Sequence, residues 1–153
     1  MKIKLLVIPV IVAFSSIVFT ADIAFAAEYE VAMKNSGSDG MMVFEPAVLK
    51  VNVGDTVHFI PTDQLHNSES VEGLTPEGAV TWKGAMNKKV SVTLDKEGVY
   101  VYQCLPHVPL AMVGVIVAGE PTNLEQIKAK AADFSTRFAT NKDRLDKYLL
   151  SLQ

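Results

Sequence analysis

The chain has 153 residues, of which 49% are hydrophobic, and carries a formal net charge of −3. This length predicts a single domain with enough apolar side chains for one core. The acidic balance argues against the basic surface that nucleic-acid-binding proteins present to phosphates, so no nucleic-acid partner is expected.

The N-terminal segment has the pattern of a secretory signal peptide. Lys2 and Lys4 precede an apolar run without charge over residues 5–20, and the small residues Ala24 and Ala26 follow it. A basic start, an apolar middle and small residues before the cleavage point are the three parts of such a leader. The alternative is an uncleaved membrane anchor, but the run is shorter than the roughly 20 residues that a spanning helix needs.

We therefore predict a signal peptide over residues 1–26 and a mature domain over residues 27–153. Loss of the leader removes two lysines and one aspartate, which makes the net charge −4. A protein exported in this way is expected in an oxidising compartment, with no membrane attachment after cleavage.

Short strands separated by turn residues follow the leader. Strands that recur about every 8 to 12 residues with no helix between them favour an antiparallel sandwich or barrel over an α/β fold. We predict one all-β sandwich. The expected strands are Tyr29–Lys34, Met42–Glu45, Val48–Val53, Thr56–Pro61, Lys89–Leu94, Val99–Cys104 and Met112–Val117.

Two stretches depart from this strand pattern. Residues 62–88 form a long connection rich in glycine, with room for one short strand around Val80–Trp82. Residues 121–153 are rich in Ala, Lys and Leu, and their apolar residues recur at helical spacing. We expect two C-terminal helices, each with one apolar face packed on the sandwich.

The residues with metal-binding chemistry gather in "CLPHVPLAM" over residues 104–112. Cys104, His107 and Met112 lie on or between two expected strands, and His66 follows the end of an earlier strand. An unpaired cysteine in an oxidising compartment is a hazard unless something occupies it. Two imidazoles, one thiolate and one weak thioether make the ligand set of a blue-copper site.

Other functions remain open at this level. Zinc accepts two histidines and a cysteine but gains little from a thioether. An enzyme with Cys104 as nucleophile would need a third, orienting group, and none stands out. The third histidine, His58, alternates with apolar neighbours in "TVHFI" and is expected on the strand surface, away from the site.

The chain resembles the cupredoxins, and more narrowly the pseudoazurins, from about Tyr29 to its C-terminus. The segments that carry this resemblance are "DGMMVFEPAVLKVNVGDTVHFIPTD", "HN" at 66–67, "GVYVYQCLPH" and "MVGVIVAG". The resemblance implies a Greek-key β-sandwich with two C-terminal α-helices and no enzyme activity. It also implies one type 1 copper ion per monomer, used for one-electron transport and held by His66, Cys104, His107 and Met112.

The resemblance further implies how the protein meets its partners. These would be periplasmic redox proteins, such as a copper nitrite reductase or c-type cytochromes, that dock around His107, while the protein itself is a monomer. We expect Asn67 to tie the ligand loops together. The predicted docking patch comprises Met42, Leu65, Val108, Pro109 and Leu110. The lysines usual around it are replaced by Ser36, Ser38, Gln64, Glu72 and Gln103.

Overall fold

The computed structural model describes residues 26–152. The predicted signal peptide lies outside the described residues except for Ala26, so the boundary at residue 27 stays a prediction. Within the described range, no helix combines the length and the hydrophobicity that a membrane crossing requires.

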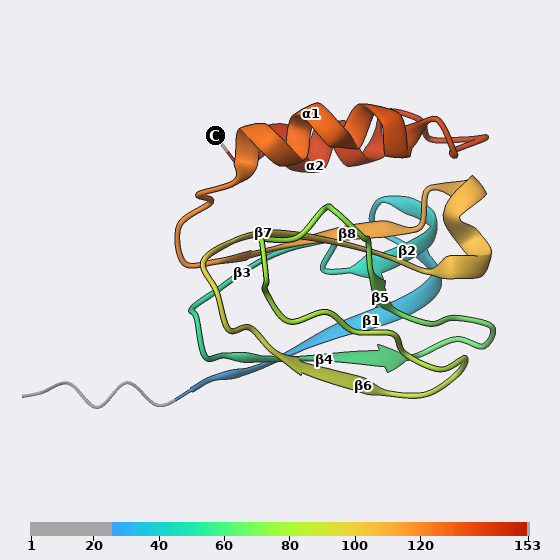
Figure 1. Ribbon diagram of the computed structural model, residues 1–153. Helices are drawn as coiled ribbons and strands as arrows, with labels where there is room; N and C mark the ends of the chain where they lie inside the picture. Colours follow the sequence, from blue (N-terminus) through green and yellow to red (C-terminus); the bar gives the residue numbers. More distant parts are fainter. Residues whose placement is uncertain (1–25, 153) are drawn as a thin grey trace, which may run out of the picture.

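Strands dominate the described chain, and two α-helices close it (Figure 1). The elements are β1 (Glu28–Gly37), β2 (Gly40–Glu45), β3 (Val48–Val51), β4 (Thr56–Pro61), β5 (Glu69–Ser70), β6 (Val90–Thr93), β7 (Gly98–Gln103), the 3-10 helix η1 (Leu105–Leu110), β8 (Val113–Ala118), α1 (Leu124–Ser135) and α2 (Arg144–Leu150).

The strands form two four-stranded sheets that face each other. One sheet has the order β2-β1-β4-β6 and the other β3-β8-β7-β5. The predicted sandwich is confirmed, but the antiparallel pairing expected for it holds for only some of the neighbouring strands. The pairs β1–β4 and β3–β8 are parallel, so both sheets are mixed.

Aromatic rings fill the space between the two sheets. The Tyr102 ring lies edge-on to Phe44 and Phe59, with centroid distances of 4.7 and 4.9 Å. Opposite Tyr102 on β8, a side chain at Gly114 would place its Cβ 2.3 Å from the tyrosine hydroxyl, so only glycine fits. Cys104 and Met112 belong to the same hydrophobic cluster as these rings.

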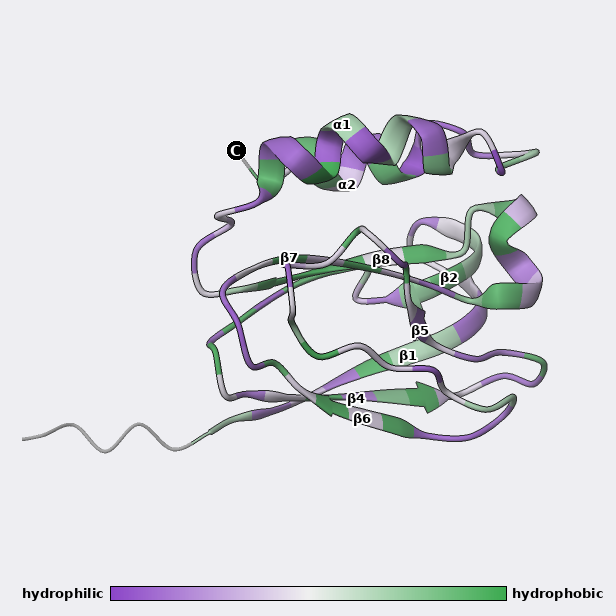
Figure 2. Cartoon of the chain, in the orientation of Figure 1, coloured by the Kyte–Doolittle hydropathy of each residue, from purple (hydrophilic) through white to green (hydrophobic). Residues whose placement is uncertain are grey.

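The strands β7 and β8 are buried on both faces. Val99 and Val101 point away from the sandwich core and pack with residues of α1 and α2, such as Ile127 and Leu145, in a second hydrophobic cluster. The helices lie over the outer face of this sheet (Figure 1), and hydrophobic and hydrophilic residues share their surfaces (Figure 2). The predicted helical cover is therefore confirmed.

The long connection differs from its prediction in one detail. There is no strand at Val80–Trp82 in the described chain; instead, the short strand β5 pairs with the end of β7, and Lys83 forms a single bridge to Glu69. Through β5, this segment joins the edge of the sheet next to β7, the strand that Cys104 follows.

Candidate metal centre

Three of the four predicted ligands lie close together in the loop between β7 and β8. Cys104 follows β7, His107 lies within η1, and Met112 precedes β8. The His107 N–H donates to the Cys104 carbonyl at 3.0 Å, and the Met112 N–H donates to the His107 carbonyl at 3.2 Å. The Cys104 N–H in turn donates to the Met112 carbonyl at 3.0 Å. These bonds fold the loop into a tight turn at the end of the β7–β8 pair.

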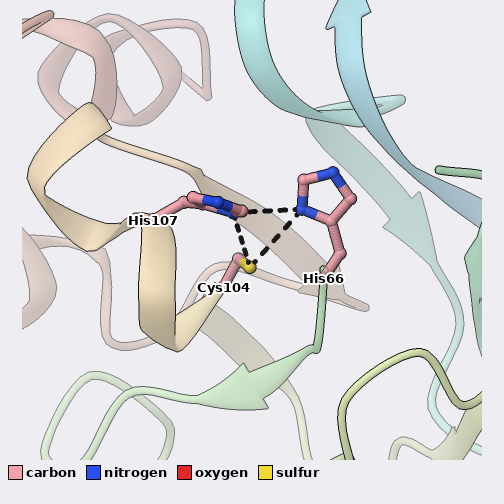
Figure 3. A group of neighbouring side chains, drawn as sticks. All are labelled: His66, Cys104 and His107. Atoms are coloured by element: carbon pink, nitrogen blue, oxygen red, sulfur yellow. Dashed lines mark hydrogen bonds between the residues drawn. The ribbon is translucent and has the colours of Figure 1, made fainter. Parts of the chain in front are cut away.

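The structure brings His66 to this loop from the connection between β4 and β5. His66 Nδ1 and His107 Nδ1 lie 3.1 Å apart, and Cys104 Sγ lies 3.7 Å from the first and 3.4 Å from the second. Both rings turn the same nitrogen toward the sulfur (Figure 3). Cys104 and His66 are fully buried, whereas His107 is half-buried.

These separations suit one metal ion in a trigonal plane. With bonds of about 2.0 Å to nitrogen and about 2.3 Å to sulfur, as in zinc sites, ligand atoms at 120° lie about 3.5 to 3.7 Å apart. The observed distances of 3.1, 3.4 and 3.7 Å are close to these values. A thiolate and two imidazoles are donors that copper binds well, so the residues present fit the ion.

Burial favours the neutral form of all three groups. It lowers the pKa of His66, which His107 lowers further, and it also lowers the pKa of His107. Burial raises the pKa of the Cys104 thiol, although backbone hydrogen bonds from Asn67 and His107 oppose this rise. Neutral imidazoles are ready to ligate, and the buried thiolate needs a positive partner to form.

The outer nitrogen of His66 has a partner that the sequence did not reveal. His66 Nε2 lies 3.0 Å from Asn35 Oδ1 on β1. Because an amide oxygen only accepts, Nε2 donates and Nδ1 is left free to ligate. No spacing rule links Asn35 to His66; the parallel pairing of β1 with β4 places them together.

Met112 is fully buried and lies in the same hydrophobic cluster as Cys104. It lies directly before β8, and its side chain belongs to the cluster between the two sheets. Its role as the fourth ligand stays a prediction.

Asn67 joins the two ligand-bearing segments as the sequence suggested. Its Oδ1 accepts a 2.8 Å hydrogen bond from the Leu105 N–H, and its Nδ2 donates to the Gly84 carbonyl at 3.2 Å. Asn67 is also buried. By contrast, His58 remains on the strand surface, where its Nδ1 pairs with Ser91 Oγ at 2.7 Å.

One of the predicted patch residues does not lie on the surface around His107. Val108 is only 2% exposed because it packs into the cluster beneath the helices, whereas Met42 is half-buried, as His107 is. Met41, which the sequence did not single out, is exposed at 66%. The exposed apolar residues on this surface are called the apolar patch below. They are Met41, Leu65, Leu105, Pro109 and Leu110.

One of the five positions where the resemblance led us to expect a surface lysine is also wrong. Gln103 does not belong to the surface around the site, since it is buried and its Nε2 donates to Glu69 Oε1 at 2.8 Å. Ser36, Ser38, Gln64 and Glu72 are exposed.

Comparison with known proteins agrees with this geometry. Residues 31–119 match the model of the copper-binding proteins of the plastocyanin/azurin family. A pseudoazurin from Methylorubrum extorquens is 44% identical over 107 residues, which cover 69% of this chain and 72% of that protein. A pseudoazurin from Paracoccus pantotrophus is 41% identical over 105 residues, covering 68% of this chain and 72% of the relative. The chain belongs to the pseudoazurin family.

Solved structures of pseudoazurins have the same fold. The refined structure from Methylobacterium extorquens AM1 is 39% identical, with a TM-score of 0.73, and the match covers 82% of this chain and 99% of that one. The native protein from Hyphomicrobium denitrificans is 40% identical, with a TM-score of 0.71, and the match covers 82% and 98%.

Membership in the pseudoazurins identifies copper as the cofactor and electron transfer as the activity. The predicted absence of enzyme activity is confirmed on the same ground, because pseudoazurins are electron carriers. The reading of Cys104 as a catalytic nucleophile is therefore set aside.

Proposed function

We propose that this chain is a periplasmic type 1 copper carrier in which His66, Cys104, His107 and Met112 hold one ion. Copper, when bound, supplies the one-electron change between Cu(I) and Cu(II). The observation that carries this proposal is the convergence of His66 Nδ1, His107 Nδ1 and Cys104 Sγ within 4.8 Å of one another.

The residues of the chain keep this site nearly unchanged during electron transfer. Cys104 is anchored by β7, Asn67 ties the His66 segment to the ligand loop, and Asn35 fixes the His66 ring. A site that moves little on oxidation requires little reorganisation, and its potential would respond to the weak thioether ligand Met112 and to hydrogen bonds at the thiolate sulfur.

His107 connects the buried site to the outside. It is half-buried, whereas His66, Cys104 and Met112 are fully buried. Its neighbours Leu105 and Leu110 are exposed at 47% and 37% and belong to the apolar patch. Such a surface suits brief docking, and the partners we propose are periplasmic redox proteins such as a copper nitrite reductase or c-type cytochromes.

The ligand set is tested by copper loading of the mature protein and of single variants, followed by visible absorption and electron paramagnetic resonance. Wild type should be intensely coloured, and Cys104→Ser should be colourless. His66→Gln and His107→Gln should lose the type 1 spectrum, whereas the matched surface variant His58→Gln should keep it. Met112→Leu should keep the thiolate band in an altered form.

A colourless oxidised wild-type protein would overturn the proposal. If it bound zinc with equal or greater affinity and failed to cycle between Cu(I) and Cu(II), the alternative of a non-redox metal-binding module would stand instead.

The proposed location is tested by separating host cells into periplasmic and membrane fractions and analysing the protein from the fraction that contains it. Its mass and first residues should match a chain that begins at Ala27. A chain that retains residues 1–26 and sediments with membranes would instead support the uncleaved anchor.

A further inference from the structure

Arg144, the first residue of α2, reaches from the helical cover to the copper-ligand loop. Its Nη1 donates to the carbonyls of Ala111 at 3.0 Å and Leu110 at 3.4 Å, next to Met112 in the chain. The same nitrogen donates to the Met42 carbonyl at 3.0 Å. Its Nη2 donates to the carbonyls of Asp39 at 3.1 Å and Met41 at 3.2 Å.

This guanidinium is buried without a carboxylate partner. Arg144 is only 6% exposed, and no ion pair of residues 26–152 includes it. A buried cation is costly unless its donors are satisfied, and here backbone carbonyls satisfy them. If one of these carbonyls moved away, a buried N–H group of the guanidinium would lose its acceptor. The guanidinium therefore restrains the positions of the carbonyls that it binds.

The connection between α1 and α2 reinforces the same contact. The N–H groups of Ala139 and Thr140 donate to the Pro109 carbonyl at 2.8 and 3.2 Å. Asn141 Nδ2 donates to the Leu110 carbonyl at 3.3 Å. In Figure 1 this connection lies at the end of the molecule where η1 is found. The carbonyls of Pro109, Leu110 and Ala111 are thus all bonded from the helical cover.

The residue that precedes Met112 has an unusual backbone. Ala111 has φ 56° and ψ 42°, the left-handed region, which costs a residue other than glycine about 1 kcal/mol or more. Its N–H donates to the Val108 carbonyl at 2.9 Å, and its carbonyl accepts from Arg144. This conformation turns the chain from η1 into β8 and so sets the direction in which Met112 leaves the loop.

We propose that Arg144 is a positioning residue for the copper site, which holds Ala111 in its left-handed conformation and thereby fixes Met112 relative to Cys104 and the two histidines. This inference rests on the ligand set proposed above. It gives the C-terminal helices a role beyond covering the sheet, since through Arg144 they would fix the position of Met112, the proposed fourth ligand.

The proposal is tested with Arg144→Met and Arg144→Lys, and with Arg137→Met as the matched control. Arg137 is the only other arginine in the sequence, and its exposed guanidinium lies over the Phe134 ring at 5.2 Å. Lysine keeps the charge and the apolar stem but cannot donate to several carbonyls in the fixed geometry of the guanidinium.

The first measurement uses copper-free protein. Amide hydrogen exchange at Ala111 and Met112 should be at least about tenfold faster in Arg144→Met than in wild type, with Arg144→Lys between them. Exchange at Tyr100 in β7 should change little. The control Arg137→Met should match wild type at all three positions.

The second measurement uses copper-loaded protein. The relative intensities of the visible thiolate bands and the shape of the paramagnetic resonance spectrum would respond to the position of the weak thioether ligand Met112, so both should change in Arg144→Met and less in Arg144→Lys. A variant that is only less stable would keep the wild-type spectrum.

Wild-type exchange and a wild-type spectrum in Arg144→Met would overturn the proposal. If that variant does not fold, the same two results in Arg144→Lys would overturn it. A colourless wild-type protein would defeat the proposed copper function, but the exchange measurements without copper would still decide whether Arg144 holds the loop.

Discussion

The Asn67 side chain accepts a hydrogen bond of 2.8 Å from the backbone N–H of Leu105. The bond joins the residue after His66 to the residue after Cys104, which are 38 positions apart in the chain. Because Asn67 is buried, loss of its amide would leave the Leu105 N–H without this acceptor.

We therefore expect Asn67→Ala to lower the free energy of unfolding of copper-free protein by about 1 kcal/mol, the usual net contribution of one hydrogen bond. Urea denaturation at neutral pH measures this change. The exposed amide Gln64→Ala, on the same segment, serves as control and should change the midpoint little. Equal midpoints for the two variants would show that the bond does not hold the segments together.

Asn35→Ala should weaken copper binding without unfolding the protein. Asn35 Oδ1 fixes the His66 ring through Nε2, and loss of such a partner lowers metal affinity by about 10- to 100-fold in known sites. Competition titration with a Cu(I) chelator measures the affinity. Asn35→Asp keeps an acceptor at the same place and should bind copper close to wild type. If alanine and aspartate bind equally well, the contact does not orient the ring.

The ligand loop was the easiest part of the site to predict. Cys104, His107 and Met112 lie within nine residues, so strand alternation and a short loop leave their side chains few alternatives. His66 was predicted from its place just past a strand end, which brings it to the same end of the sandwich.

The sequence did not predict features that depend on how distant parts of the chain pack together. The contact of Asn35 with His66 requires the parallel β1–β4 pair, and local patterns do not encode strand order. Val108 was predicted on the surface because it follows His107 in the loop. It is buried because α1 and α2, which come later in the sequence, cover that side of the sheet.

Asp55 should make the stability of the protein depend on pH in the acid range. Its carboxylate accepts from the N–H groups of Ala27 at 2.8 Å and Asn52 at 2.7 Å, and these bonds lower its pKa. A carboxyl with a depressed folded-state pKa stabilises the fold above its unfolded pKa of about 3.9, and this contribution is lost as the pH falls through the folded value.

Asp55→Asn should therefore cost about 2 kcal/mol at neutral pH, as expected for hydrogen bonds to a charged group, and progressively less in acid. Urea denaturation of copper-free protein at several pH values between neutral and strongly acidic tests this expectation. The exposed Asp146→Asn is the control and should lower stability little at any pH. A difference between Asp55→Asn and wild type that stays constant with pH would contradict the assignment.

Electron transfer to protein partners should depend only weakly on salt. The apolar patch contains no charged residue. Of the exposed positions where lysines were expected, Ser36, Ser38 and Gln64 are neutral and Glu72 is acidic. Strong electrostatic steering raises association rates by about 10- to 1000-fold and is lost as salt shortens the Debye length from about 30 Å at 0.01 M to about 3 Å at 1 M.

We expect the second-order rate constant with an acidic c-type cytochrome or copper nitrite reductase to fall by less than about threefold over this range of salt, as measured by stopped-flow absorption. Gln64→Lys adds a cation beside the patch and should increase the salt dependence, whereas Leu65→Ser should lower the rate at every salt concentration. A steep fall for wild type would mean that charged residues elsewhere on the surface guide docking, and the patch would then be only the final contact.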